Sequence, residues 1–166
     1  MLTKHKEQRV VILIDVQNMY YSARNLYGAK VNFKEILKAA LSGRKLIRAI
    51  AYGIRTEWEE EKPFFEALKR MGIEVRMKDL QIFPGGLKKG DWDVGIAVDS
   101  IKFSRYVDVI VLVSGDGDFI PLLRYLKNAT PVRVEVVAFS HTCSSKLREL
   151  ADDFIDLDKN PKRFLL

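Results

Sequence analysis

The chain has 166 residues, 48% of them hydrophobic and 30% charged, which is the composition of an ordinary globular protein long enough to bury one core. Its 28 Lys and Arg residues outnumber its 22 Asp and Glu residues, and the net charge of +6 is compatible with a polyanionic partner. The sequence has no apolar run of transmembrane length and no secretory signal pattern, so we expect neither membrane insertion nor secretion. Its one cysteine, Cys143, excludes an internal disulfide and a multi-cysteine zinc site. Together these features lead us to expect a cytoplasmic protein.

The first half of the chain alternates apolar runs with helical patterns. The runs VVILID, KLIRAIAYGI and IEVRMKDL predict strands at 10–15, 45–54 and 73–80. Helices that end at glycines are predicted over residues 18–28, 33–43 and 57–72, and Asn32 and Thr56 are candidate caps for the second and third of them. The run VVILID has no polar alternation, which is typical of a strand buried on both faces of a parallel sheet.

The second half continues this rhythm after a glycine- and lysine-rich stretch at 81–93, which we predict to be a loop. Helices are predicted over residues 93–104, 119–128 and 144–152. Strands are predicted over residues 107–113, 132–139 and 154–157. Because no linker or internal repeat is present, we predict a single domain over 1–166, with a core at 10–158 and a short basic tail at 1–8.

This order of elements predicts an α/β fold in which a mainly parallel sheet of five to six strands lies between two layers of helices. A strand order of 3-2-1-4-5 would make the first and fourth strands neighbours where the winding direction reverses. In such sheets the ligand binds at that position, beyond the carboxyl ends of the strands. Asp15 ends the first strand and Asp116 follows the fourth, so we predict the site between them.

Each acidic residue near this position has a structural alternative. Asp118 precedes a helix and is a candidate cap, a contact that stabilises a helix by about 0.5–2 kcal/mol, whereas Asp116 has no evident cap to make. Asn18 is a candidate cap for the helix after the first strand. Asp15, in contrast, ends a fully apolar strand, where an unpaired charge is costly. Capping therefore explains Asn18 and Asp118 better than it explains Asp15 and Asp116.

The segment KKGDWDVGIAVDSI adds Asp91, Asp93 and Asp99. One of the first two is expected to cap the helix that begins there. Asp99 lies six residues after Asp93, about 600° further round a helix, so these two side chains do not share a face. On a helix that is apolar almost all round, we expect Asp99 to be a paired structural carboxylate, and a supporting role in the site is the alternative.

Three or four converging carboxylates cannot all ionise unless a cation lies between them. Oxygen ligands without clustered His or Cys favour Mg²⁺ or Mn²⁺, which assist hydrolysis of phosphodiesters. Lys88 and Lys89 are candidates for holding a nucleic-acid backbone, and Ser114 is a candidate donor to phosphate or carboxylate. The two lysines also fit a solvated loop. The segment GDGDFI does not complete a dinucleotide fingerprint, and no P-loop or G-x-S-x-G elbow occurs.

The segments ILIDVQN, KGDWDVGIAVD and DVIVLVSGDGDF together resemble the NYN domains of the PIN-like nuclease superfamily, in the branch with a strand-end SGD-x-D-F motif. The resemblance spans residues 10–158 and implies a Rossmann-like three-layer α/β/α domain with a metal-dependent ribonuclease site. The acids that it implies as catalytic residues and metal ligands are Asp15, Asp93, Asp116 and Asp118. It further implies that Asn18 orients the site and that Asp99 is an additional acid. In GDWD we favour Asp93 over Asp91, because the helical pattern begins at Asp93.

We therefore expect a Mg²⁺- or Mn²⁺-dependent ribonuclease that acts on single-stranded or structured RNA, and the resemblance implies a 5′-phosphate product. The alternative is an RNA-binding or protein-interaction module with a PIN-like fold and little or no turnover. A topoisomerase-primase-like domain is disfavoured because it would place a glutamate where Asp15 stands. The oligomeric state is open, with a homodimer among the options.

Overall fold

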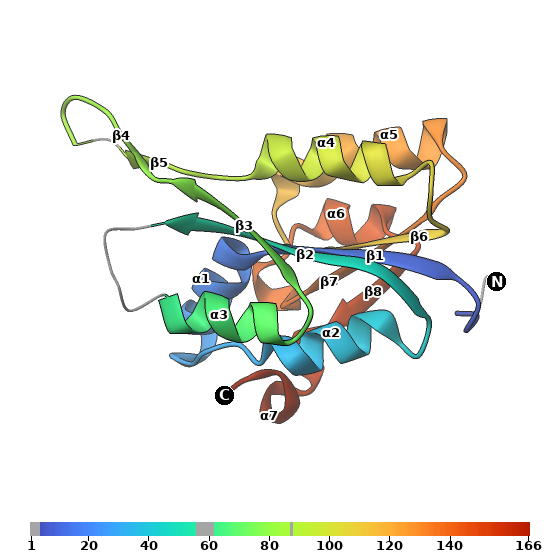
Figure 1. The fold of residues 1–166 in the computed structure, drawn as a ribbon, viewed down its shortest axis with the longest axis horizontal. Helices are drawn as coiled ribbons and strands as arrows, with labels where there is room; N and C mark the ends of the chain where they lie inside the picture. Colours follow the sequence, from blue (N-terminus) through green and yellow to red (C-terminus); the bar gives the residue numbers. More distant parts are fainter. Residues whose placement is uncertain (1–3, 56–61, 87) are drawn as a thin grey trace.

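The centre of the molecule is a six-stranded sheet (Figure 1). The computed structural model describes residues 4–55, 62–86 and 88–166. The strands of this sheet are β1 (Arg9–Asp15), β2 (Lys45–Arg55), β3 (Glu74–Asp79), β6 (Val109–Val113), β7 (Arg133–Ala138) and β8 (Asp153–Asp156). They lie in the order β3-β2-β1-β6-β7-β8, and every neighbouring pair is parallel. The predicted α/β fold and strand order are confirmed, with β8 as the sixth strand.

Helices cover both faces of the sheet (Figure 1). One layer contains α1 (Val16–Tyr27), α2 (Phe33–Leu41) and α3 (Lys62–Arg70). The other contains α4 (Asp93–Phe103), α5 (Ile120–Ala129) and α6 (Ser145–Leu150). The short helix α7 (Pro161–Phe164) packs against α2, and the 3-10 turns are η2 (Gly117–Phe119), η3 (Ser140–Thr142) and η4 (Leu157–Lys159). This three-layer arrangement explains why the central strands are apolar on both faces.

The core lies around the two central strands, β1 and β6. Residues 10–14 of β1 are fully buried, and all five residues of β6 are buried as well. Asn32 caps α2 as predicted, since its side chain accepts a hydrogen bond from the amide of Glu35. The helix then ends at Ser42, which has a left-handed conformation, one residue before the predicted stop at Gly43. The predicted cap at Thr56 lies outside the described residues.

The segment 81–93, predicted to be a loop, contains a small hairpin. Strands β4 (Gln81–Ile82) and β5 (Lys88–Lys89) pair in antiparallel fashion and extend away from the main sheet (Figure 1). The prediction of a simple loop was therefore incomplete. Two-residue strands are too short to show the alternation of polar and apolar residues by which a strand is recognised in a sequence.

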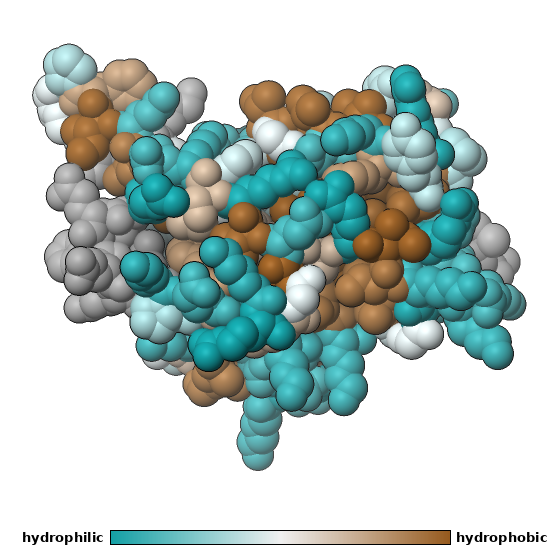
Figure 2. All heavy atoms as spheres, viewed as in Figure 1, coloured by the Kyte–Doolittle hydropathy of each residue, from teal (hydrophilic) through white to brown (hydrophobic). Residues whose placement is uncertain are grey.

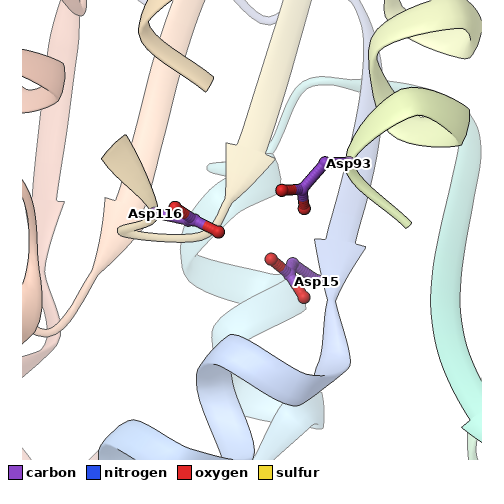
Figure 3. Close-up of side chains that lie close together, drawn as sticks. All are labelled: Asp15, Asp93 and Asp116. Atoms are coloured by element: carbon purple, nitrogen blue, oxygen red, sulfur yellow. The ribbon is translucent and has the colours of Figure 1, made fainter. Parts of the chain in front are cut away.

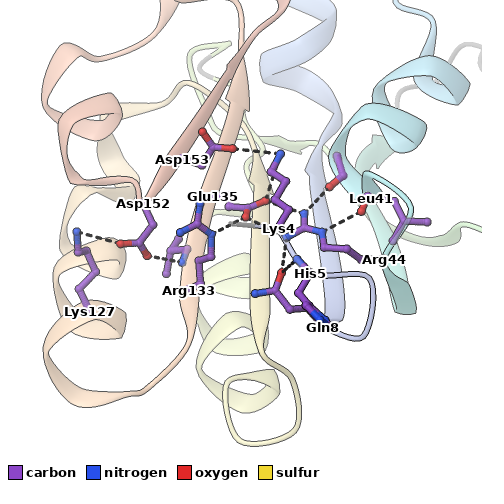
Figure 4. A network of polar contacts seen from close by, with 12 residues as sticks. Lys4, His5, Gln8, Leu41, Arg44, Lys127, Arg133, Glu135, Asp152 and Asp153 are labelled. Carbon is purple, nitrogen blue, oxygen red and sulfur yellow. Dashed lines mark hydrogen bonds and ion pairs between the residues drawn. The ribbon is translucent and has the colours of Figure 1, made fainter. Parts of the chain in front are cut away.

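A buried network of charges lies at the amino edge of the sheet, opposite the carboxyl ends of the strands (Figure 4). Its centre is Glu135 of β7, which is 1% exposed and accepts hydrogen bonds from Arg44 at 2.8 and 3.0 Å. The Arg133 side chain donates to the same carboxylate at 2.8 Å, and Lys4 pairs with Asp153 at 3.1 Å. The buried acid at this edge is thus neutralised by cations of the chain itself.

Helix α4 is apolar on its outer side as well as on its inner side. Ile96 and Phe103 are buried, whereas Val94, Val98 and Ile101 are exposed. Figure 2 shows the resulting hydrophobic surface over α4. Within the described part of the chain, no helix combines the length and apolar character needed to cross a membrane.

Candidate metal centre

Three aspartates converge at the carboxyl edge of the sheet (Figure 3). Asp15 is the last residue of β1, Asp93 is the first residue of α4, and Asp116 lies in the turn after β6. One carboxylate oxygen from each lies within 4.8 Å of those of the other two. Ile14 is paired with Val113, so β1 and β6 end at the same level of the sheet. This register is the reason that residues about 100 positions apart in the chain meet here.

Ser114 and Asn18 connect the two strand ends. The Ser114 hydroxyl donates to Asp15 Oδ2 at 3.0 Å and accepts from the amide of Asp116 at 3.2 Å. The Asn18 side-chain oxygen accepts from the amide of Gly115 at 2.9 Å, and the Asn18 amide donates to Asp15 Oδ1 at 3.3 Å. Asp15 therefore caps α1, so the prediction of Asn18 as the cap was wrong, because the helix begins at Val16; Asn18 instead holds the turn that carries Asp116. Both polar residues singled out from the sequence lie against the acids.

The turn after β6 assigns different positions to its two aspartates. Asp116 Oδ1 accepts a hydrogen bond from the amide of Asp118 at 2.9 Å and so caps η2. Asp118 is exposed, makes no capping hydrogen bond to α5, and is not among the three converging carboxylates. The expected capping roles are thus reversed, because η2 begins at Gly117, two residues before the predicted helix.

Gly115 allows this turn to lie against the segment that follows β7. A Cβ atom at Gly115 would lie 2.9 Å from Cys143 Cα, and the Ser144 amide donates to the Gly115 carbonyl at 3.0 Å. Burial raises the pKa of the Cys143 thiol to about 11, so this thiol stays protonated at neutral pH. Cys143 therefore contributes packing beside the acids and has no thiolate to offer as a nucleophile.

The other acids of the middle segment have separate positions. Asp91 Oδ1 accepts a hydrogen bond from the backbone amide of Asp93 at 3.0 Å, but the N-cap residue of α4 is Trp92, so the prediction that one of the two acids caps this helix was wrong. Asp99 is 8% exposed, lies outside the converging group, and pairs with Tyr52 and Arg76. The sequence suggested that Asp99 is paired, but it gave no means of identifying Tyr52 and Arg76 as the partners.

Lys88 and Lys89 form β5, and the prediction that their side chains hold RNA lies outside what the structure describes. The backbone of β5 still places this pair on the hairpin just before α4, which begins at Asp93.

The electrostatics of the three carboxylates are unfavourable without a cation. Burial raises the pKa of Asp15 to about 6, and nearby Asp116 and Asp91 add to this effect. Burial together with the negative charge of Asp116, Asp91, Asp15 and Asp118 raises the pKa of Asp93 to about 7. Among residues whose side chains the structure describes, no Lys, Arg or His forms an ion pair with Asp15, Asp93 or Asp116.

These properties fit a metal ion. Three carboxylate oxygens from separate elements converge on one point, and fixed hydrogen bonds from Ser114 and Asn18 orient two of the elements. Hard oxygen donors of this kind suit cations such as Mg²⁺ and Mn²⁺. The group of Asp15, Asp93 and Asp116 can therefore hold a metal ion.

Comparisons with known proteins agree with this description. The model of the NYN domain matches residues 9–158. The low amplitude and bright protein LabA of Synechococcus elongatus is 29% identical over 161 residues, which cover 92% of this chain and 86% of LabA. The crystal structure of VPA0982, a protein of unknown function from Vibrio parahaemolyticus, is similar with a TM-score of 0.88 at 33% identity, over 99% of this chain and all of that one. The resemblance seen in the sequence motifs is confirmed, and the chain belongs to the NYN domain family.

Proposed function

We propose that this protein is a Mg²⁺- or Mn²⁺-dependent ribonuclease that hydrolyses phosphodiester bonds of RNA at the carboxyl edge of its sheet. The observation that carries the proposal is the convergence of Asp15, Asp93 and Asp116 within 4.8 Å without a neutralising cation among the described side chains. Membership of a PIN-like nuclease family supports a nucleic-acid substrate. The net charge of +6, which already includes these acids, supports a polyanionic one.

Asp15, Asp93 and Asp116 are the proposed ligands of the cation. When bound, a divalent cation activates water and offsets the negative charge of a phosphodiester undergoing hydrolysis. Asp15 is fixed by Ser114 and by its capping of α1, and Asp116 is fixed by its bond to the Asp118 amide. Fixed ligands lower the reorganisation that cation binding would otherwise require.

The residues around the ligands have supporting roles in this proposal. Asn18 keeps the turn after β6 against α1 through its bond to the Gly115 amide. Asp118 is exposed beside Asp116, where its carboxylate is available to a ligand that enters from solvent. Lys88 and Lys89 are proposed to bind backbone phosphates of the RNA other than the one that is hydrolysed.

The test is cleavage of end-labelled RNA, single-stranded and hairpin, with Mn²⁺, with Mg²⁺ and with EDTA. We expect cation-dependent cleavage with 5′-phosphate products, and we expect Asp116→Asn to reduce it by at least about 100-fold, because this change removes one ligand of the cation. The matched control is Asp79→Asn, which removes a carboxylate whose side chain is 83% exposed and which is not one of the three converging acids.

Equal cleavage by wild type and Asp116→Asn would mean that the activity is a contaminant or that the site is elsewhere. Tight, salt-dependent RNA binding without cleavage under any cation would favour the alternative of a binding module, and would refute the proposed ribonuclease.

A further inference from the structure

Asp99 of α4 is a buried acid that the proposed catalytic site does not use. Its Oδ2 accepts a hydrogen bond from the Tyr52 hydroxyl at 2.7 Å and is ion-paired with Arg76. Tyr52 is 1% exposed on β2, and Arg76 lies beside it on the neighbouring strand β3, where the two are paired in register. Asp99 thus fastens the second half of α4 to the two strands on one side of β1.

We propose that Asp99, Tyr52 and Arg76 form a lock that fixes the rotation of α4 and thereby positions the Asp93 carboxylate beside Asp15 and Asp116. The inference rests on the proposed function, because it concerns the ligand that α4 supplies to the cation. Asp99, Tyr52 and Arg76 are positioning residues, since they act through Asp93 and do not touch the cation themselves.

The lock is needed because hydrophobic burial does not select one rotation of α4. Ile96 and Phe103 are buried, but Val94, Val98 and Ile101 are exposed on the same helix. Exchanging the inner and outer sides of such a helix changes the buried apolar area little, in contrast to an ordinary amphipathic helix. A buried acid with one matching cation does distinguish these rotations, as buried polar groups do when they set the register of coiled coils.

A second attachment lies at the beginning of α4. The Trp92 indole N–H donates to the Gly53 carbonyl of β2 at 2.8 Å, and the Trp92 ring packs on Tyr52 with centroids 5.3 Å apart. A Cβ atom at Gly95 would lie 2.6 Å from the Trp92 ring, so the ring covers the first turn of the helix closely. Residues 92 and 99 are about two helical turns apart. With both attached to β2, α4 cannot rotate without breaking one attachment.

Asp93 lies between these two attachments and points away from them. It is six residues before Asp99, and about 600° of helical rotation leaves the two side chains roughly 120° apart around the helix. Asp93 therefore faces Asp15 and Asp116, while Asp99 faces Tyr52. Repulsion among the three carboxylates favours a rotation that moves Asp93 away from the others. The bonds of Asp99 and Trp92 to the sheet oppose this rotation and keep the ligands together before the cation arrives.

The test measures Mn²⁺ affinity by calorimetry, with no RNA present, for wild type, Tyr52→Phe and Asp99→Asn. We expect each change to weaken Mn²⁺ binding about threefold to tenfold, because Tyr52→Phe removes the hydrogen bond to Asp99 and Asp99→Asn removes the negative charge that pairs with Arg76. The matched control is Asp108→Asn. It also breaks a carboxylate–arginine pair, with Arg9 at 3.1 Å, but it does so at the amino edge, and we expect unchanged affinity.

A double-mutant cycle separates positioning from general loosening. If Asp99 acts through Asp93, then Asp99→Asn has no further effect on Mn²⁺ affinity in the Asp93→Asn background. Equal affinities of wild type, Tyr52→Phe and Asp99→Asn would overturn the lock, as would full additivity in the cycle.

Failure of the proposed metal site gives a different result, namely wild-type protein that binds no Mn²⁺, and failure of the proposed ribonuclease alone leaves this Mn²⁺ titration unaffected. The lock then still has a metal-free readout, the hydrogen exchange of the Ile96 amide, which donates to the Trp92 carbonyl at 2.7 Å in the first turn of α4. Faster exchange in Tyr52→Phe than in Asp108→Asn supports the lock, and equal exchange overturns it.

Discussion

The raised pKa values of Asp15 and Asp93 predict an unusual dependence of stability on pH. Burial raises the pKa of Asp15 from its ordinary value of 3.8 to about 6, and burial and neighbouring acids raise that of Asp93 to about 7. The folded protein therefore holds these protons more tightly than the unfolded chain does. For such groups the free energy of unfolding falls as the pH rises from about 4 to about 7, and it stays low above that range.

The size of the effect follows from the shift at Asp15. A pKa that moves from 3.8 to about 6 corresponds to a loss of up to about 3 kcal/mol between acidic and neutral pH. For a chain of this length, this loss corresponds to a melting temperature lower by about 6–12 °C. Asp93 acts with the same sign, and a smaller contribution is expected from it because its side chain is more open to solvent.

Asp15→Asn isolates this effect. The carboxamide oxygen can still accept the hydrogen bond from the Asn18 backbone amide, which Asp15 Oδ1 accepts at 3.3 Å, so the cap of α1 is retained. The charge is lost together with the acceptor of the Ser114 hydroxyl, and the loss of that hydrogen bond does not depend on pH. We expect the metal-free variant to melt above wild type at pH 8 and to match it more closely at pH 4. Mn²⁺ at about 100 times its Kd should stabilise wild type by about 2.7 kcal/mol and should stabilise Asp15→Asn much less.

The assay is thermal unfolding at pH 4 to 8, with EDTA and with Mn²⁺, for wild type, Asp15→Asn and the control Asp79→Asn. Several acids with lowered pKa change stability in the opposite direction, and they are Glu7, Glu74, Asp108, Asp153 and Asp158. Their effect lies below about pH 5 and is common to all three proteins, so the difference between wild type and Asp15→Asn isolates Asp15. A difference that does not change with pH, or equal stabilisation of both by Mn²⁺, would refute the reasoning.

Two further predictions concern packing and buried charge. Gly115→Ala places a Cβ 2.9 Å from the Cys143 backbone, so we expect the free energy of unfolding in denaturant to fall by about 1–3 kcal/mol and Mn²⁺ binding to be lost. The control Gly117→Ala places a Cβ 3.3 Å from its nearest neighbour, and we expect a much smaller fall. Glu135→Ala removes the carboxylate that neutralises the buried Arg44. We expect the free energy of unfolding to fall by about 3–5 kcal/mol and the Mn²⁺ affinity of the folded protein to stay unchanged. A fall of less than about 1 kcal/mol would show that water replaces the carboxylate.

The sequence predicted the sheet and the position of the site because both depend on local patterns and general topology rules. Continuous apolar runs identified the buried central strands, and the alternation with helices restricted the connections to one hand. Asp15 and Asp116 could be predicted as neighbours because each follows the end of a strand, and strands β1 and β6 pair in register at that end. Asp93 was predicted from the resemblance to the NYN domains, and the start of the helical pattern favoured it over Asp91; the structure places it beside the other two acids.

What the sequence could not predict depends on partners that are distant in the chain. Arg76 is 23 residues from Asp99, and nothing in a strand pattern distinguishes it from the other exposed or half-buried basic residues. The reversal between Asp116 and Asp118 depends on a turn that begins two residues earlier than the helical pattern indicates. The hairpin of β4 and β5 has two residue pairs, fewer than any periodicity requires.

The distribution of counter-charges explains why the half-buried triad differs from the buried acids of the described chain. Glu135 is paired with Arg44, and Asp99 is paired with Arg76, so each of these acids is neutralised by a residue that folds with it. Burying a carboxylate without such a partner is destabilising. Asp15, Asp93 and Asp116 bear this cost together, and among the described side chains no arginine, lysine or histidine forms an ion pair with them. A divalent cation taken from solution would neutralise the triad and could still bind a phosphodiester oxygen. An arginine in its place would occupy the space between the carboxylates and would prevent a cation from binding there.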